Sequence, residues 1–116
     1  MLYFGLDGDG IGRIVESMMI ENNLEELKDF SIMVVKAIEA IRDLAIDKGA
    51  SIVFCTGDSI LFYGNIDPSF GKEIVEMFRE TTGRTASVGI GEKISATYLG
   101  LKLAKSKGGN QVIFFR

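Results

Sequence analysis

Hydrophobic residues recur along this chain at two spacings, one typical of helices and the other typical of short buried strands. The helical spacing is clearest after Asn23, where apolar side chains recur every three or four residues at Leu24, Leu27, Val34, Ile38, Ile41 and Leu44. Asn22 or Asn23 can cap this long helix, and Lys48 followed by Gly49 is a typical end. A brief helix should precede it, with one apolar side formed by Ile11, Ile14, Val15, Met18 and Met19.

Five short apolar segments predict strands. The first covers residues 2–6 and ends at Asp7. Residues 51–56 and 59–64 flank the dipeptide Gly57-Asp58, and two such segments around a tight turn predict a hairpin. The last two strands are predicted over residues 85–91 and 111–115.

Two more helices should alternate with the last strands. Asp67 followed by Pro68 is a typical helix start, and Ser95 is a candidate cap for a final helix that runs through Lys107. The resulting order is β-α-α-β-β-α-β-α-β. It predicts a single α+β domain over residues 1–116 with one mixed central sheet.

The expected pairing of the strands brings two acidic residues together. The first strand should lie centrally, beside the hairpin. If it pairs antiparallel with the second hairpin strand, its end lies next to the hairpin turn. Asp7 and Asp58 would then be neighbours, although they are far apart in the sequence.

Composition narrows the chemistry that such a site could perform. The 116 residues carry a net charge of −3, which gives no basic surface for a long nucleic acid. Histidine is absent, and this excludes imidazole bases, histidine-dependent nucleophiles and most zinc sites. A single cysteine cannot form an internal disulfide. No segment is apolar enough to span a bilayer and no secretory signal opens the chain, so we expect a cytoplasmic protein without a membrane partner.

Two carboxylates among glycines favour a divalent metal site. Mg²⁺ and Mn²⁺ prefer carboxylate, carbonyl and water oxygens, with open positions for substrate phosphates. Two ions about 3.5–4 Å apart can support an in-line phosphoryl displacement. Asp7 and Asp58 are the expected metal ligands and catalytic acids, the Gly8 carbonyl is a further candidate ligand, and Asp9 is a candidate for the outer shell.

Three other interpretations of the same residues can be compared with the metal site. Aspartate beside glycine is common in plain turns. A dinucleotide-binding loop would need glycine where Arg13 stands. A calcium-binding EF-hand loop would need a ligand at Ile11 and a glutamate at Met18. The last two patterns therefore fail, whereas the turn remains an alternative to the metal site.

Three segments in order resemble a known family. The start "LDGDGIG", the hairpin "CTGDSILF" and the closing "ATYLGLKLAKSKGGNQVIF" are similar to the nucleotidyl cyclase palm of the GGDEF type. The beginning of the chain resembles most closely the minimal CRISPR polymerases, which are single palm domains related to the polymerase palm of CRISPR effectors. The resemblance implies a ferredoxin-like palm in which Asp58 stands for the metal-binding acid of the hairpin.

The resemblance also implies an activity and partners. These enzymes are expected to make a cyclic dinucleotide of the cyclic di-AMP type from ATP with Mg²⁺ or Mn²⁺, in antiphage defence, for a downstream effector that senses the product. A cyclic dinucleotide needs two nucleotides facing each other, so a homodimer is expected. The expected nucleotide-binding residues are Gly8, Asp9, Gly10, Ile11, Gly12 and Gly57, with Lys105 on the β- and γ-phosphates and Lys102 assisting.

The chain departs from the GGDEF pattern at several positions. Ser59 replaces a possible carboxylate ligand, and Gly109 replaces an arginine. Val15 and Leu24 stand where diguanylate cyclases read guanine, which favours ATP over GTP. Side chains such as Met18, Met19, Phe70 and Phe78 are typical of core packing, and a dimer interface is the alternative for them.

Rival functions remain open from the sequence. The chain could be a diguanylate or mononucleotide cyclase. The missing second acid at Ser59 favours a catalytically silent palm that binds nucleotide and reports it to a partner. The remaining possibility is a ferredoxin-like binding module without a nucleotide.

Overall fold

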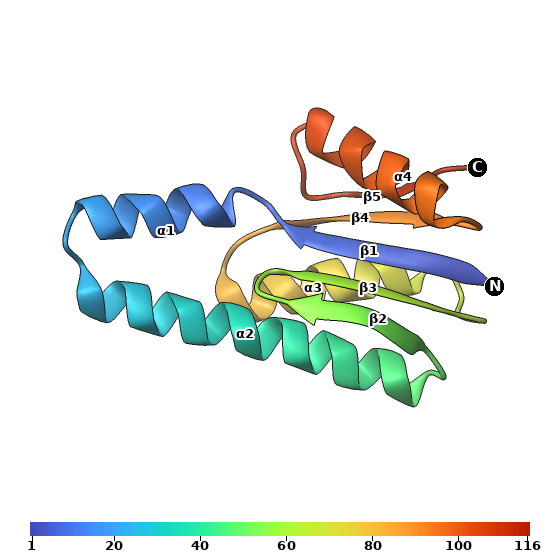
Figure 1. The fold of residues 1–116 in the computed structure, drawn as a ribbon, viewed down its shortest axis with the longest axis horizontal. Coiled ribbons are helices and arrows are strands. Elements are labelled where there is room, and N and C mark those ends of the chain that lie inside the picture. The colour runs from blue at the N-terminus through green and yellow to red at the C-terminus, as the bar shows by residue number, and fades with distance from the viewer.

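The computed structural model describes residues 1–116, with five strands and four helices in the predicted order. The elements are β1 (Leu2–Gly8), α1 (Ile11–Ile20), α2 (Leu24–Asp47), β2 (Ser51–Thr56), β3 (Ser59–Gly64), α3 (Phe70–Thr82), β4 (Ala86–Gly91), α4 (Ile94–Ser106) and β5 (Val112–Phe114). The predicted α+β class is confirmed. Figure 1 shows the strands side by side, with helices on both faces of the sheet.

The five strands form one mixed sheet in the order β2-β3-β1-β4-β5. The central strand β1 pairs antiparallel with β3 on one side and with β4 on the other. The edge strand β5 runs parallel to β4. The prediction that the first strand lies centrally and antiparallel to the second hairpin strand is confirmed.

Helices α2 and α3 cover one face of the sheet and enclose the core. Because side chains alternate along a strand, every second residue of β1, β3 and β4 faces these helices. The fully buried strand residues of this core are Phe4, Leu6, Ile60, Phe62, Ala86, Val88 and Ile90. Phe70 and Phe78 of α3 belong to the same core, with 2% and 0% of their surface exposed. Their core packing is therefore confirmed, and the alternative that they form a dimer interface is wrong, because both rings are already covered within one chain.

Helix α4 packs on the opposite face, very close to β4. A Cβ atom on Gly89 would overlap the backbone of α4 at Thr97 and Leu101. The Thr97 hydroxyl donates a hydrogen bond to the carbonyl of Tyr3 across 3.1 Å. Glycine on β4 thus lets α4 lie directly on the sheet, and this close packing fixes where the lysines of α4 can reach.

Two helix starts differ from the prediction. The last helix begins at Ile94 after an extended Lys93, so Ser95 lies inside the helix and does not cap it. Helix α3 begins at Phe70 because the preceding residues form a tight turn instead. In that turn Asp67 Oδ1 accepts a hydrogen bond of 2.8 Å from the backbone N–H of Ser69.

Helix α1 and the first half of α2 extend beyond the strand ends (Figure 1). Only Ile11 of α1 is buried, and Met19 at its far end keeps 63% of its surface exposed. None of the helices has the combination of length and apolar composition that crossing a membrane requires.

Candidate active site

The register of the central strands brings the two predicted acids together. Asp7 of β1 lies opposite Ser59 of β3, and Asp58 directly precedes Ser59 in the hairpin turn. The backbone N–H of Gly8 donates to the carbonyl of Asp58 across 3.0 Å. A Cβ on Gly8 would lie 3.2 Å from Oδ2 of Asp58, so the carboxylate sits directly over this glycine. The predicted proximity of Asp7 and Asp58 is confirmed.

The two carboxylates influence each other electrostatically. Burial, followed by the negative charge of Asp7, raises the pKa of Asp58 above its usual value, and the positive charge of Lys105 opposes this rise. The pKa is raised first because burial disfavours the charged carboxylate and only then because Asp7 is near. A cation bound at this end of the strands would favour the charged form.

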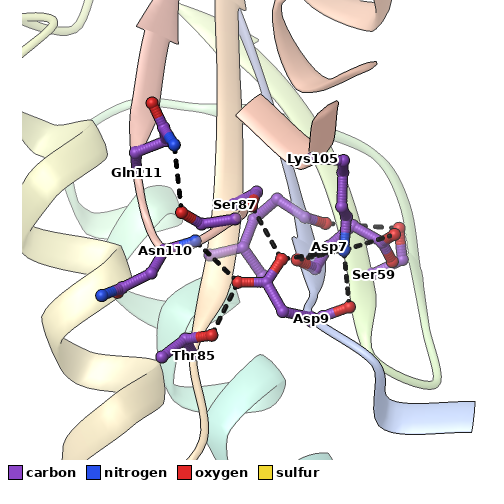
Figure 2. A network of polar contacts seen from close by, with 11 residues as sticks. Asp7, Asp9, Ser59, Thr85, Ser87, Lys105, Asn110 and Gln111 are labelled. Atoms are coloured by element: carbon purple, nitrogen blue, oxygen red, sulfur yellow. Dashed lines mark hydrogen bonds and ion pairs between the residues drawn. The ribbon is translucent and has the colours of Figure 1, made fainter. Parts of the chain in front are cut away.

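Lys105 reaches this acidic site from α4. Its ammonium nitrogen Nζ lies 3.3 Å from Oδ2 of Asp7 and 3.0 Å from Oδ1 of Asp9. The same nitrogen donates to the carbonyl of Gly8 across 2.7 Å and to that of Asp7 across 3.3 Å. Figure 2 shows the lysine pointing between the two aspartates. In this structure, therefore, Lys105 faces the acidic residues.

Asp9 is the centre of a polar network that joins three segments (Figure 2). The hydroxyls of Thr85 and Ser87 each donate to its carboxylate across 2.7 Å. The backbone N–H of Asn110 donates to it across 2.8 Å. Together with Lys105, these donors tie the loop after β1 to the start of β4 and to the turn between α4 and β5.

The same hydrogen bonds keep Asp9 charged. Burial raises the pKa of Asp9, but the donors, led by Ser87 and Thr85, outweigh it and hold the pKa below its usual value. Only 16% of the side chain is exposed. Asp9 therefore acts in this structure as an anchor for the site.

Sequence reasoning missed the hydroxyl partners of Asp9. Thr85 and Ser87 stand two residues apart in the predicted strand, and this spacing places both side chains on one face. Ser87 is fully buried. A hydroxyl pair on a strand that is otherwise apolar could have indicated a buried polar partner, although its identity depends on the sheet order.

Glycine is required near the acids for different structural reasons at different positions. Gly10 and Gly57 have φ angles of +63° and +49°, which favour glycine because other residues rarely adopt them. Gly8 has no room for a side chain because a Cβ would lie 2.5 Å from Ile11. Gly12 has open space around it, so neither argument applies there.

A small pocket of about 180 Å³ lies next to Asp58, between α1, α2 and the hairpin turn. Its wall is mostly apolar and is formed by Ile11, Val15, Phe30, Ser31, Val34, Val35, Gly57 and Asp58. Val15 is one of the two positions expected near a base. Leu24, the other, is not part of this wall and is exposed at the start of α2.

The second candidate lysine lies apart from the acids. Nζ of Lys102 is 5.8 Å from the centre of the Tyr98 ring. Lys102 and Lys105 both line an open groove of about 670 Å³ along α4, together with Leu99, Leu103, Ser106 and Phe115. A phosphate chain in this groove could contact both lysines.

The oxygen ligands at this site fit a hard divalent cation whose remaining ligands come from water and substrate. Asp7, Asp58 and the Gly8 carbonyl offer only oxygen atoms. No group of three or more His, Cys, Asp or Glu residues is arranged to hold a metal. Mg²⁺ commonly binds through one or two carboxylates, with water and phosphate oxygens as its other ligands.

The comparison with solved structures shows the fold. The chain is similar to the active GGEEF domain of a diguanylate cyclase from Vibrio cholerae, with 12% sequence identity and a TM-score of 0.60. The match covers 99% of this chain and 82% of that one. The predicted ferredoxin-like palm is therefore confirmed as a GGDEF-like palm. A search among curated proteins finds no match.

The comparison with protein families uses the sequence alone and identifies a family. The model of the minimal CRISPR polymerase domain matches residues 3–115, which is nearly the whole chain. This agrees with the resemblance of the three sequence segments and with a palm that carries its acids at the edge of the sheet. The chain belongs to the minimal CRISPR polymerase domain family.

Proposed function

We propose that this palm is a metal-dependent nucleotidyltransferase that joins ATP into a cyclic dinucleotide of the cyclic di-AMP type. The observation that carries the proposal is the meeting of Asp7 and Asp58 where β1 ends beside the hairpin turn, with Gly8 next to both. Family membership supports a polymerase or nucleotidyl cyclase reaction. It also favours a role in antiphage defence, in which a downstream effector senses the product.

The reaction consists of two phosphoryl-transfer steps of the same kind. A ribose hydroxyl oxygen of one nucleotide forms a bond to the α-phosphorus of another. The bond from that phosphorus to its bridging oxygen breaks, pyrophosphate leaves, and the hydroxyl proton passes to solvent. Repetition with the roles reversed closes the ring and releases a second pyrophosphate.

Each residue of the site has a task in this reaction. When bound, Mg²⁺ or Mn²⁺ supplies Lewis-acid activation of the hydroxyl and charge neutralisation on the phosphates. Asp7, Asp58 and the Gly8 carbonyl hold the cation. Lys105 binds the β- and γ-phosphates as a point charge, with Lys102 from the same groove. Gly8, Asp9, Gly10 and Gly57 lie in or next to the turns beside the acids, and Ile11 and Gly12 begin α1 there; these are the residues proposed to admit the phosphates.

The pocket beside Asp58 supports ATP as the substrate. Its apolar wall suits the flat face of a purine ring. Apart from Asp58, Ser31 is the only wall residue whose side chain can form a hydrogen bond. Guanine presents more hydrogen-bonding groups on its edge, and these would be left unpaired there, so adenine is favoured.

A second copy of the chain supplies the second nucleotide. One acidic site can orient one triphosphate, so two chains facing each other complete the pair of reacting nucleotides. Met19 at the exposed end of α1 is the strongest remaining interface candidate, whereas Met18 is partly buried against the core.

Product identification tests this proposal. The purified protein is incubated with ATP or GTP and Mg²⁺ or Mn²⁺, and the products are identified by mass spectrometry while pyrophosphate is measured. We expect a cyclic dinucleotide from ATP. Asp58→Asn should lower the rate at least about 100-fold, as removal of a group that stabilises the transition state commonly does.

Asp47→Asn provides the matched control. Asp47 is an exposed aspartate at the end of α2, just before β2 begins and therefore at the opposite end of the sheet from Asp58. Its substitution should leave the rate unchanged. Unchanged turnover in Asp58→Asn would refute the proposed ligand role of Asp58.

The second candidate is a palm that binds nucleotide without turnover. The hydroxyl of Ser59 donates to the carbonyl of Leu6 across 3.3 Å, within the sheet, and supplies no further carboxylate. The site therefore has one acid fewer on the hairpin than the GGDEF pattern. ATP binding without pyrophosphate release in the same assay would favour this function.

A further inference from the structure

Lys105 occupies the part of the site where a divalent cation would bind. Its ammonium contacts Oδ2 of Asp7 and the carbonyl of Gly8, two of the three groups that we assign to the cation. It also contacts Asp9 and the Asp7 carbonyl, so four oxygen atoms lie within 3.3 Å of Nζ. An ammonium surrounded by oxygens in this way takes the place of a metal ion.

The ammonium and a divalent cation would compete for these oxygens. Two positive charges in contact with the same carboxylate and carbonyl repel each other strongly at a partly buried site. Lys105 and Asp7 keep only 30% and 36% of their side-chain surface exposed, so solvent screens this repulsion only in part. Binding of the cation therefore requires Lys105 to move away.

Lys105 can occupy a second position, and its departure would leave the Asp9 network intact. Its side chain also lines the open groove along α4, where Lys102 lies and where no acidic residue forms part of the wall. Asp9 stays in place without Lys105, because Thr85, Ser87 and the Asn110 N–H still hold its carboxylate. The lysine can thus leave Gly8 and Asp7 while the loop keeps its shape.

We infer that Lys105 is an exchangeable internal cation, which neutralises Asp7 and binds the Gly8 carbonyl in the metal-free protein and is released to the open groove along α4 when the divalent cation binds. This inference rests on the proposed function, since it concerns the same acidic site. Its consequence is ordered loading. The cation alone binds weakly because it must displace the lysine, and it binds well together with a triphosphate that receives the lysine.

Titration with Mn²⁺ in the absence of nucleotide tests the exchange, by calorimetry or by the electron spin resonance signal of unbound Mn²⁺. Lys105→Met should bind Mn²⁺ at least about tenfold more tightly than the unchanged protein. Lys102→Met is the matched control. It removes the same charge from the same helix, but Lys102 forms no ion pair with an acid, so its Mn²⁺ affinity should stay within about twofold.

A second measurement needs no variant. Acetylation of lysine amines is followed residue by residue by mass spectrometry, with Lys102 as the internal reference. In EDTA, Lys105 should react more slowly than Lys102 because its amine is held by four oxygens. Saturating Mn²⁺ should increase its reaction rate and leave that of Lys102 unchanged. Equal rates for the two lysines in EDTA would overturn the inference.

The outcomes separate the inference from the proposed function. If Mn²⁺ binds equally well to the unchanged protein and to Lys105→Met, the exchange is wrong while the metal site stands. If no variant binds Mn²⁺, even with a non-hydrolysable ATP analogue, both the exchange and the metal-dependent function are wrong.

Discussion

Gly109 offers a sharp test of the Asp9 network. Helix α4 ends in a turn where Gly108 and Gly109 have φ angles of +102° and +75°. The N–H of Gly109 bonds back to the carbonyl of Ala104 across 2.9 Å, and the N–H of Asn110 then points to Asp9. A Cβ on Gly109 would lie 2.6 Å from Oδ2 of Asp9, whereas one on Gly108 would meet nothing within 4 Å.

Alanine at these two positions should therefore have different costs. Both variants carry the backbone strain of a positive φ, roughly 1–2 kcal/mol. Gly109→Ala must also move the Asp9 carboxylate by several tenths of an ångström, away from donors that lie at 2.7–2.8 Å. Loss of one hydrogen bond to a charged group costs about 1.5–3 kcal/mol more. We expect roughly 2.5–5 kcal/mol for Gly109→Ala and only the strain for Gly108→Ala.

Urea denaturation followed by circular dichroism measures both free energies of unfolding. The same pair of variants in an Asp9→Ala background completes a double-mutant cycle, because the clash disappears with the carboxylate. There the cost of Gly109→Ala should fall to that of Gly108→Ala. Equal losses for the two glycine variants with Asp9 present would refute the argument that Gly109 is required by the carboxylate.

Two further predictions concern the metal-free protein. Burial and Asp7 raise the pKa of Asp58, so the folded state binds more protons than the unfolded chain, and stability should fall as pH rises through the Asp58 titration. Asp58→Asn should therefore raise the melting temperature in EDTA at pH 7, and an unchanged or lower value, measured by calorimetry, would contradict this. Gly89→Ala should lower the free energy of unfolding, measured in urea, by about 3 kcal/mol or more, because its Cβ meets the backbone of α4. Gly12→Ala in α1 meets nothing and should raise this free energy by about 0.5 kcal/mol. Similar effects of the two variants would argue against the close packing of α4.

The local elements could be predicted because their signals are local. The apolar spacing of α2, the caps at its ends and the turn at Gly57-Asp58 each depend on residues within a few positions of one another. Where the local signal was ambiguous, the prediction was wrong. Ser95 resembles a cap, yet the helix begins at Ile94, because Lys93 is the last residue with extended backbone.

The proximity of Asp7 and Asp58 could be predicted by one further step. The hairpin fixes where Asp58 lies relative to β3, and antiparallel pairing with β1 then fixes Asp7. The apolar spacing of α3 places Phe70 and Phe78 together on an inward face, but not what that face covers. An apolar helix face packs equally well against its own sheet or against another chain, and the choice depends on which face of the sheet α3 covers.

The order of helices and strands, the exclusion of histidine chemistry and the choice of Asp7 and Asp58 as candidate acids all follow from the amino-acid sequence alone. The surroundings of those acids follow only from the folded chain. Asp9 meets Thr85, Ser87 and Asn110, and Lys105 meets Asp7 and Gly8, across more than 70 residues of chain. Such contacts depend on β4 lying beside β1 and on α4 lying close against the glycines of the sheet, and no local pattern encodes either arrangement.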